Sequence, residues 1–208
     1  MGKLQTEWQK LKGMSLGEKA EYIWMYYKSW FVGALAVIAL IYLGITMYHG
    51  IQTNVLLNVA VVGGNSQNTT AFVGLENEIK EELQADGKYD KVRIQANIPE
   101  DGGSVSSQTA LTTLIGADSV DILICPEEIY EEYHAQRGFE NLETYLTEKE
   151  SKISGHLVNE NALVFEGEKN VEELFGVAYD KIYITVMVNQ QHSQGAKAFF
   201  EVLENRIS

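Results

Sequence analysis

The sequence contains little cysteine, little proline and little positive charge. Cys125 is the one cysteine in 208 residues, so no disulfide can form within the chain and a disulfide scaffold is excluded. Two prolines and 18 glycines exclude a collagenous repeat and a proline-rich disordered chain. The 16 Lys and Arg are outnumbered by 29 Asp and Glu, which gives a net charge of −13. Because a strongly acidic protein is a poor partner for polyanions, we expect no nucleic-acid binding.

Charge of either sign is missing between Lys28 and Glu76. Within that stretch, Trp30–Tyr48 contains nothing more polar than Thr46, and as a helix it would be roughly 28 Å long, close to the thickness of a bilayer core. The apolar run is longer than that of a cleaved signal peptide, and no small-residue cleavage pattern follows it. A core helix of so small a domain is rarely apolar on every face. We therefore predict a transmembrane helix over residues 29–49.

The charges on the two sides of this helix differ in sign. Residues 1–28 carry five Lys and three Glu, a net charge of +2, whereas the rest of the chain carries 11 basic and 26 acidic residues, a net charge of −15. No Lys or Arg occurs in the first 27 residues beyond Tyr48. The positive-inside rule predicts a single-pass protein of the cell membrane, with a cytoplasmic N-terminus and residues 50–208 on the extracellular side.

The N-terminal 28 residues carry a helix signal of their own. Ser15 and Glu18 fit a capping box, so we expect a helix that begins at Leu16 and continues into the membrane span. Before it, Trp8, Leu11 and Met14 recur at helical spacing among lysines. This lead is either an interfacial amphipathic helix that docks a partner or an anchor that sets the depth and tilt of the span.

Residues 50–208 alternate between strand and helix patterns. Apolar or alternating runs predict strands at 55–62, 91–97, 121–125 and 181–188, and helical periodicity predicts helices at 69–84, 104–115 and 127–137 and from Ser193 onward. Gly138 is expected as the C′ residue of the third helix. Residues 148–175 combine charged loops with weak strands such as 162–165. Because three strands separated by helices form a βαβαβ unit, we predict a single three-layer α/β lobe with a mainly parallel sheet.

Two of these stretches resemble bacterial extracellular solute-binding proteins. In residues 121–146, an apolar strand that begins at Asp121 is followed by a helix and then by Gly138-Phe-Glu-Asn-Leu142. Residues 182–189, with Ala196 and Phe199-Phe200 after them, resemble the late strand and helix of the same family. In addition, residues 14–28 resemble the cytoplasmic lead of uncharacterised single-span proteins from Gram-positive, clostridia-like bacteria. The resemblance implies a fold like one half of a periplasmic binding protein.

The sequence departs from that family in one respect. Solute-binding proteins have two lobes that close on a ligand by a hinge. Here about 40 residues, from Gly138 to Lys181, stand where the family would insert a second lobe. The resemblance therefore implies a single lobe, and it supports the fold more than it supports ligand capture.

The expected ligand-binding residues follow the strand ends. Ligands of open parallel sheets sit beyond the carboxyl ends of the strands, and each such end here precedes a predicted helix. The candidates at these ends are Gly64, Asn65, Ser66, Gly103, Ser104 and Glu127. The alternative is that these residues serve only as turn and cap residues, because Gly, Asn and Ser are common in turns. Neither a G-x-G-x-x-G nor a P-loop motif occurs.

Signals for catalysis and for metal binding are weak. The four histidines are scattered with no H-x-x-x-H or H-E-x-x-H spacing, and no serine lies in a G-x-S-x-G motif. Cys125 ends an apolar strand, where a free cysteine is commonly a small core residue. We expect no catalytic residue, no metal, no cofactor and no enzymatic activity.

These expectations lead to three functional hypotheses. The first is a membrane-tethered extracytoplasmic binding or interaction module, an accessory to a transporter or envelope complex with a protein partner in the membrane. The second is a membrane-bound envelope hydrolase that uses Cys125 or the strand-end loops. The third is a structural partner that acts through the helix of residues 3–28. A small-molecule ligand remains open in the first hypothesis.

Overall fold

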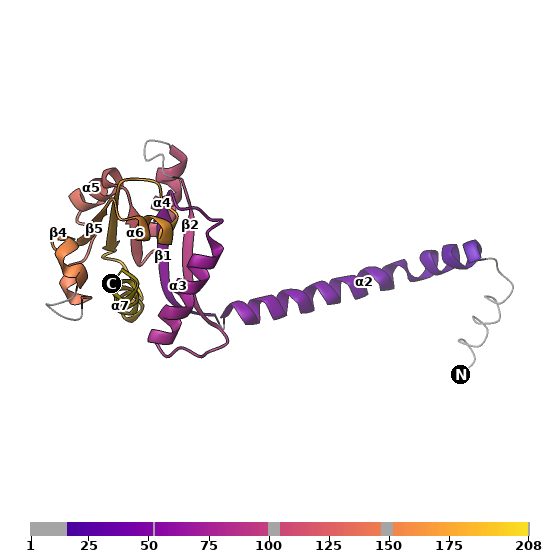
Figure 1. Cartoon of the computed structure of the whole chain (residues 1–208). Coiled ribbons are helices and arrows are strands. Elements are labelled where there is room, and N and C mark those ends of the chain that lie inside the picture. The colour runs from indigo at the N-terminus through magenta and orange to yellow at the C-terminus, as the bar shows by residue number, and fades with distance from the viewer. Residues whose placement is uncertain (1–15, 52, 100–104, 147–151, 208) are drawn as a thin grey trace. The chain divides into compact units, whose positions relative to one another are not determined.

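A computed structural model describes residues 16–51, 53–99, 105–146 and 152–207 of the chain. The chain divides into two compact units, Met1–Gln52 and Thr53–Ser208. In the first unit the described residues form the long helix α2, and the second unit is an α/β domain (Figure 1).

The helix α2 spans Leu16–Ile51, 36 residues without a break. The predicted continuation of this helix into the apolar span is confirmed, and the described residues are helical from Leu16 onward. Trp30–Tyr48 has a mean hydropathy of 2.2 with none of its surface buried, and it is long and apolar enough to cross a membrane. The predicted cap at Ser15 and the apolar residues Trp8, Leu11 and Met14 lie outside the described residues.

The α/β domain is built on one six-stranded sheet in the order β2-β1-β3-β6-β5-β4. The strands are β1 (Asn54–Val62), β2 (Asp90–Ile98), β3 (Ile122–Cys125), β4 (Leu157–Val158), β5 (Ala162–Glu166) and β6 (Lys181–Val186). β1 pairs in parallel with both β2 and β3, whereas β6 is antiparallel to β3 and to β5, and β4 is antiparallel to β5. β1, β2, β3 and β5 thus run in one direction, and the predicted mainly parallel α/β sheet is confirmed.

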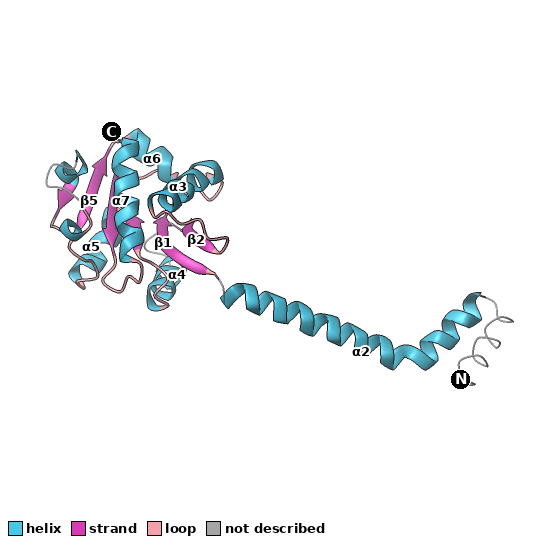
Figure 2. Cartoon of the chain, turned by 90° about the horizontal axis from the view of Figure 1, so that it is seen from below, coloured by secondary structure: helices cyan, strands magenta, loops and turns pink. Residues whose placement is uncertain are grey.

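Helices cover both faces of the sheet, which makes the three predicted layers (Figure 2). The helices are α3 (Thr69–Glu82), α4 (Val105–Gly116), α5 (Glu127–Ala135), α6 (Lys169–Phe175) and α7 (Ser193–Ile207). One buried apolar cluster joins α3, α6 and α7 to the sheet, and a second joins α4 and α5 to it. Successive β1 residues alternate between the clusters, Val59 and Val61 in the first and Ala60 and Val62 in the second, as the two-residue strand period requires.

The stretch between Gly138 and Lys181 extends the same sheet and does not form a second lobe. It contains two short 3₁₀ helices, Leu142–Thr144 and Lys152–His156, followed by β4, β5 and α6. Val171, Leu174 and Phe175 of α6 are buried in the larger core. The domain is therefore one α/β lobe.

The predicted C-terminal cap of α5 is wrong by one residue. Arg137 has a positive φ of 57°, whereas Gly138 has an ordinary φ. The Gly138 N–H donates to the Tyr133 carbonyl, and a Cβ at Gly138 would lie 3.1 Å from that oxygen. Glycine at 138 thus avoids a tight contact with this carbonyl oxygen, while Arg137 takes the left-handed conformation.

Candidate functional site

The loop after β1 contains three of the predicted ligand-binding residues, and it packs against the loop after α6. The Asn65 N–H donates to the Gly176 carbonyl over 2.9 Å. A Cβ at Gly64 would lie only 3.2 Å from the Phe175 carbonyl oxygen, so glycine permits this approach. Asn65 Oδ1 accepts the Gln67 N–H, an Asx turn. Gly64 and Asn65 therefore have the structural roles of the alternative interpretation, while Ser66 is exposed.

The segment from Gly176 to Lys181 runs along the carboxyl edge of the sheet. Gly176, at φ 64°, ends α6 in the left-handed conformation. Further along, the Tyr179 hydroxyl donates to the Val62 carbonyl at the end of β1. The Lys181 ammonium then donates a hydrogen bond to Glu127, which begins α5 just after the end of β3. The chain itself thus covers part of the edge at which the sequence predicts a ligand.

Glu127, at the start of α5, lies in a network with two residues of β6. The Lys181 ammonium donates to both Glu127 oxygens over 3.1 and 3.4 Å, and the Tyr183 hydroxyl donates to Oε1 over 3.0 Å. The bond from Lys181, followed by that from Tyr183, lowers the pKa of the Glu127 carboxyl. Burial, with the carboxylate beside it, raises the pKa of Tyr183 to about 12. Glu127 is therefore already paired within the domain.

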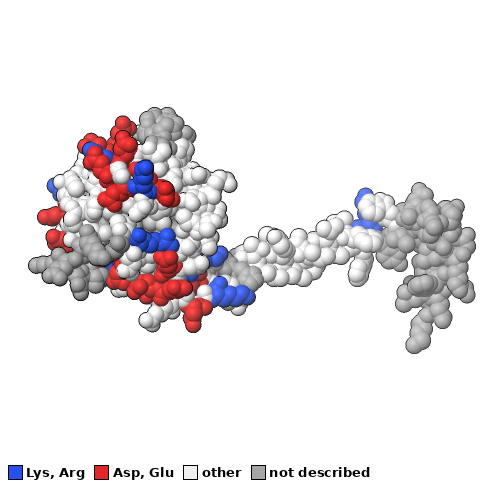
Figure 3. All heavy atoms as spheres, in the orientation of Figure 1, with Lys and Arg blue, Asp and Glu red and all other residues white. Residues whose placement is uncertain are grey.

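An open groove adjoins this network. It is lined by Pro126, Glu127, Glu128, Glu166, Tyr179, Asp180 and Lys181. Four carboxylates and one lysine make it acidic, in keeping with the acidic patches on the domain surface (Figure 3). A groove of this composition repels anions.

The loop after β2 contains the remaining two candidates, Gly103 and Ser104, which lie outside the described residues. The residues on either side of that loop, Ile98 at the end of β2 and the first turns of α4, line a pocket that the sequence did not predict. The pocket has a cavity volume of about 90 Å³ and is partly open to solvent.

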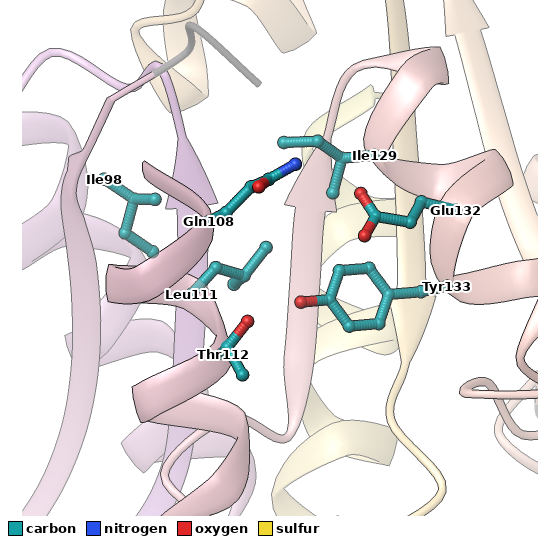
Figure 4. A pocket seen from close by; sticks show the side chains of 7 residues that line it. All are labelled: Ile98, Gln108, Leu111, Thr112, Ile129, Glu132 and Tyr133. Atoms are coloured by element: carbon teal, nitrogen blue, oxygen red, sulfur yellow. The ribbon is translucent and has the colours of Figure 1, made fainter. Parts of the chain in front are cut away.

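This pocket, called here the α4–α5 pocket, has an apolar part and a polar part (Figure 4). Ile98, Leu111 and Ile129 form the apolar part. The side chains of Gln108 and Thr112 extend from α4, and those of Glu132 and Tyr133 extend from α5 on the opposite side (Figure 4). The arrangement can hold a small molecule with one apolar end and one hydrogen-bonding end.

A buried carboxylate lies just before β3, away from the carboxyl edge of that strand. Asp121 is fully buried and accepts hydrogen bonds from the Asn58 N–H and side-chain amide, the Gln191 N–H and His192 Nδ1. The His192 contact is 2.8 Å, and its side chain is 25% exposed. Asp121 thus connects β1 and β3 to the start of α7, a structural role that sequence reasoning missed.

Cys125 is fully buried at the end of β3. Burial in the apolar core raises the pKa of its thiol, and the thiolate is the nucleophilic form. These observations argue against the hydrolase hypothesis in its Cys125 form. Within the described ranges, no three His, Cys, Asp or Glu side chains come together as a possible metal site.

Comparison with protein-family models finds no match to the chain, and comparison with curated proteins finds none either. Among solved structures, the chain is similar to the apo-form of RafE from Streptococcus pneumoniae, with 16% sequence identity and a TM-score of 0.30. The alignment covers 62% of this chain and 34% of that one, so the chain matches about a third of the length of RafE.

Proposed function

We propose that the protein is a membrane-tethered binding module whose α/β lobe stands on the extracytoplasmic side of the cell membrane. The observation that carries the proposal is that the helix containing the charge-free stretch Trp30–Tyr48 is followed almost directly along the chain by an α/β lobe. The helix α2 ends at Ile51 and β1 begins at Asn54, so only two residues separate them. A tether this short keeps the lobe close to the bilayer surface.

The α/β lobe is the part of the protein that we propose binds a ligand or a partner. It has its own apolar core on both faces of the sheet, and it contains the α4–α5 pocket. Concave sites with an apolar part and a few convergent polar groups are the usual form of small-ligand sites. The sequence resemblance to solute-binding proteins supports the same function.

The charge distribution supports the proposed orientation. Lys19 and Lys28 precede the apolar span, and the lobe carries the −15. The positive-inside rule then places the N-terminus in the cytoplasm. A lobe held near the membrane is positioned to meet a neighbouring membrane protein, and we propose that it serves a transporter or an envelope complex of the cell surface.

Cysteine labelling of cells that express the chain tests this orientation. Cys125 is buried, so a membrane-impermeant maleimide finds little background in the folded protein. Ser66→Cys places a thiol at an exposed position of the lobe, and Gly2→Cys places one before the span. We expect Ser66→Cys to be labelled in intact cells and Gly2→Cys only after the membrane is permeabilised.

The reverse labelling pattern would show that the lobe is cytoplasmic. Labelling of both positions in intact cells would show that the helix does not span the membrane. The wild-type chain, which contains Cys125 alone, is the control for background labelling.

A further inference from the structure

The α4–α5 pocket has a chemistry that selects one class of ligand, an inference that rests on the proposed binding function. Its described lining residues are Ile98, Gln108, Leu111, Thr112, Ile129, Glu132 and Tyr133. Of these described residues, Glu132 alone has a carboxylate, and neither Lys nor Arg is among them. The pocket therefore presents one negative charge beside neutral hydrogen-bonding groups.

The polar side chains converge from both helices. The Glu132 carboxylate and the Tyr133 hydroxyl point from α5 toward α4, and the Gln108 amide and the Thr112 hydroxyl lie on the opposite wall (Figure 4). Among the described residues, no hydrogen bond occupies these four side-chain groups. They provide several acceptor oxygens around one space, and an ammonium group donates three hydrogen bonds.

The apolar part of the pocket determines the size and polarity of the part of the ligand that lies against it. Leu111, Ile129 and Ile98, the last residue of β2, are all almost fully buried. Their branched side chains offer contact to a short aliphatic group and no hydrogen bond to a polar one. A sugar or another polyhydroxylated ligand would leave hydroxyls unpaired against these three residues.

The surrounding charges favour a cation at this position. Glu128 precedes Glu132 by four residues, so both carboxylates lie on the same side of α5. The lobe as a whole carries a net charge of −15, which raises the local concentration of cations and repels anions. A carboxylate ligand in the pocket would meet the like charge of Glu132.

We propose that the α4–α5 pocket binds a small primary amine with a short branched aliphatic body, free in solution. The ammonium group donates to the Glu132 carboxylate and to the neutral oxygens beside it, while the aliphatic body packs on Leu111 and Ile129. The bond to the carboxylate is charge-assisted and supplies the selectivity for amines over alcohols of the same shape.

Three probes that share one aliphatic body test the proposal: isoamylamine, isoamyl alcohol and isovalerate. Binding to the full chain in nanodiscs is measured by isothermal titration calorimetry. We expect isoamylamine to bind at least about tenfold more tightly than the alcohol or the acid, because a hydrogen bond to a charged group is made by the amine alone. High salt should weaken amine binding, since the pocket is partly open to solvent.

Glu132→Gln removes the charge and keeps the size of the side chain, and Glu131→Gln is the matched control on the same helix, outside the pocket lining. We expect Glu132→Gln to weaken amine binding at least about tenfold and Glu131→Gln to leave it unchanged. Equal thermal unfolding of both variants and the wild type shows that the fold is intact.

Equal binding of the amine by wild type and Glu132→Gln would overturn the proposal, as would equal binding of amine and alcohol, or no binding of the amine. Binding of isovalerate in preference to the amine would keep the binding module and overturn the ligand class. The labelling experiment on Ser66→Cys reports orientation alone. An error in the proposed membrane orientation can therefore be distinguished from an error in the proposed ligand class.

Discussion

At the scale of single residues, Glu127 makes the stability of the lobe depend on pH. Lys181, and after it Tyr183, lower the pKa of its carboxyl in the folded state. A carboxyl with a lowered folded pKa stabilises the fold above its unfolded value of 4.5, and this stability is lost as the pH falls through the folded pKa. Glu127→Gln should therefore make the melting temperature less dependent on pH below 4.5.

Thermal unfolding of the full chain in detergent, followed by the near-ultraviolet circular dichroism of its tyrosines from pH 6 to pH 3, measures this effect. Glu128→Gln is the control, because Glu128 makes no described hydrogen bond to Lys181 or Tyr183. If Glu127→Gln and the wild type lose stability in parallel over that range, the network contributes nothing in solution.

The sequence predicted only some of the residues that make polar contacts between distant parts of the chain. Asp121 was noted as the first residue of an apolar strand, but its partners Asn58 and Gln191 are 63 and 70 residues away along the chain. No local pattern connects residues so far apart. Likewise, Asn65 is a predicted ligand-binding residue that the structure also shows in a turn against Gly176, and the two roles look the same in sequence.

At the scale of elements, the close packing of α7 on β1 depends on one glycine. A Cβ at Gly195 would overlap the Leu56 carbonyl oxygen and lie 3.1 Å from the Leu57 Cβ. Alanine ordinarily stabilises a helix relative to glycine by up to about 1 kcal/mol. Here the added methyl meets a backbone atom, so Gly195→Ala should lower the free energy of unfolding by about 2 kcal/mol.

Gly116→Ala is the matched control for this prediction. Gly116 ends α4 without a positive φ, and no atom lies within 4 Å of a Cβ built there. The free energies of unfolding of both variants and the wild type are measured by chemical denaturation. We expect Gly116→Ala to be neutral or slightly stabilising. A Gly195→Ala variant as stable as the Gly116→Ala variant would show that α7 moves away from β1 at little cost.

The elements with strong periodicity were predicted, and so were the short apolar strands β3 and β5, whereas α6 and β4 were not. β1, α3 and α7 each bury an apolar face or run that is long enough to be recognised in the sequence, and the apolar run of α2 is recognised by its length alone. α6 has seven residues and β4 has two, too few to show a period. Both form because the core and the neighbouring strand β5 are present, and such tertiary contacts leave no local signal. The α4–α5 pocket was missed for the same reason, since its two walls come from helices separated by a strand.

The whole molecule combines two units that lie in different solvents in our proposal. The lobe buries its apolar residues in two cores, whereas no residue of Trp30–Tyr48 is buried. Exposed apolar surface on this scale is unfavourable in water, and the proposal accounts for it by placing this stretch in a bilayer. The −13 of the chain is likewise a sum of two parts, +2 before the span and −15 after it.

Charges placed in the span test whether the bilayer holds the molecule. Leu40 lies near the middle of Trp30–Tyr48 and is 67% exposed. Arginine at the centre of a transmembrane helix costs about 3 kcal/mol, so Leu40→Arg should lower the fraction of chain that stays with membranes after an alkaline carbonate wash. Adding Leu43→Arg should lower it further. Val73→Arg, an exposed position of α3 in the lobe, should leave the fraction unchanged. Retention of the double variant at the wild-type level would mean that contacts other than burial of α2 in lipid hold the chain at the membrane.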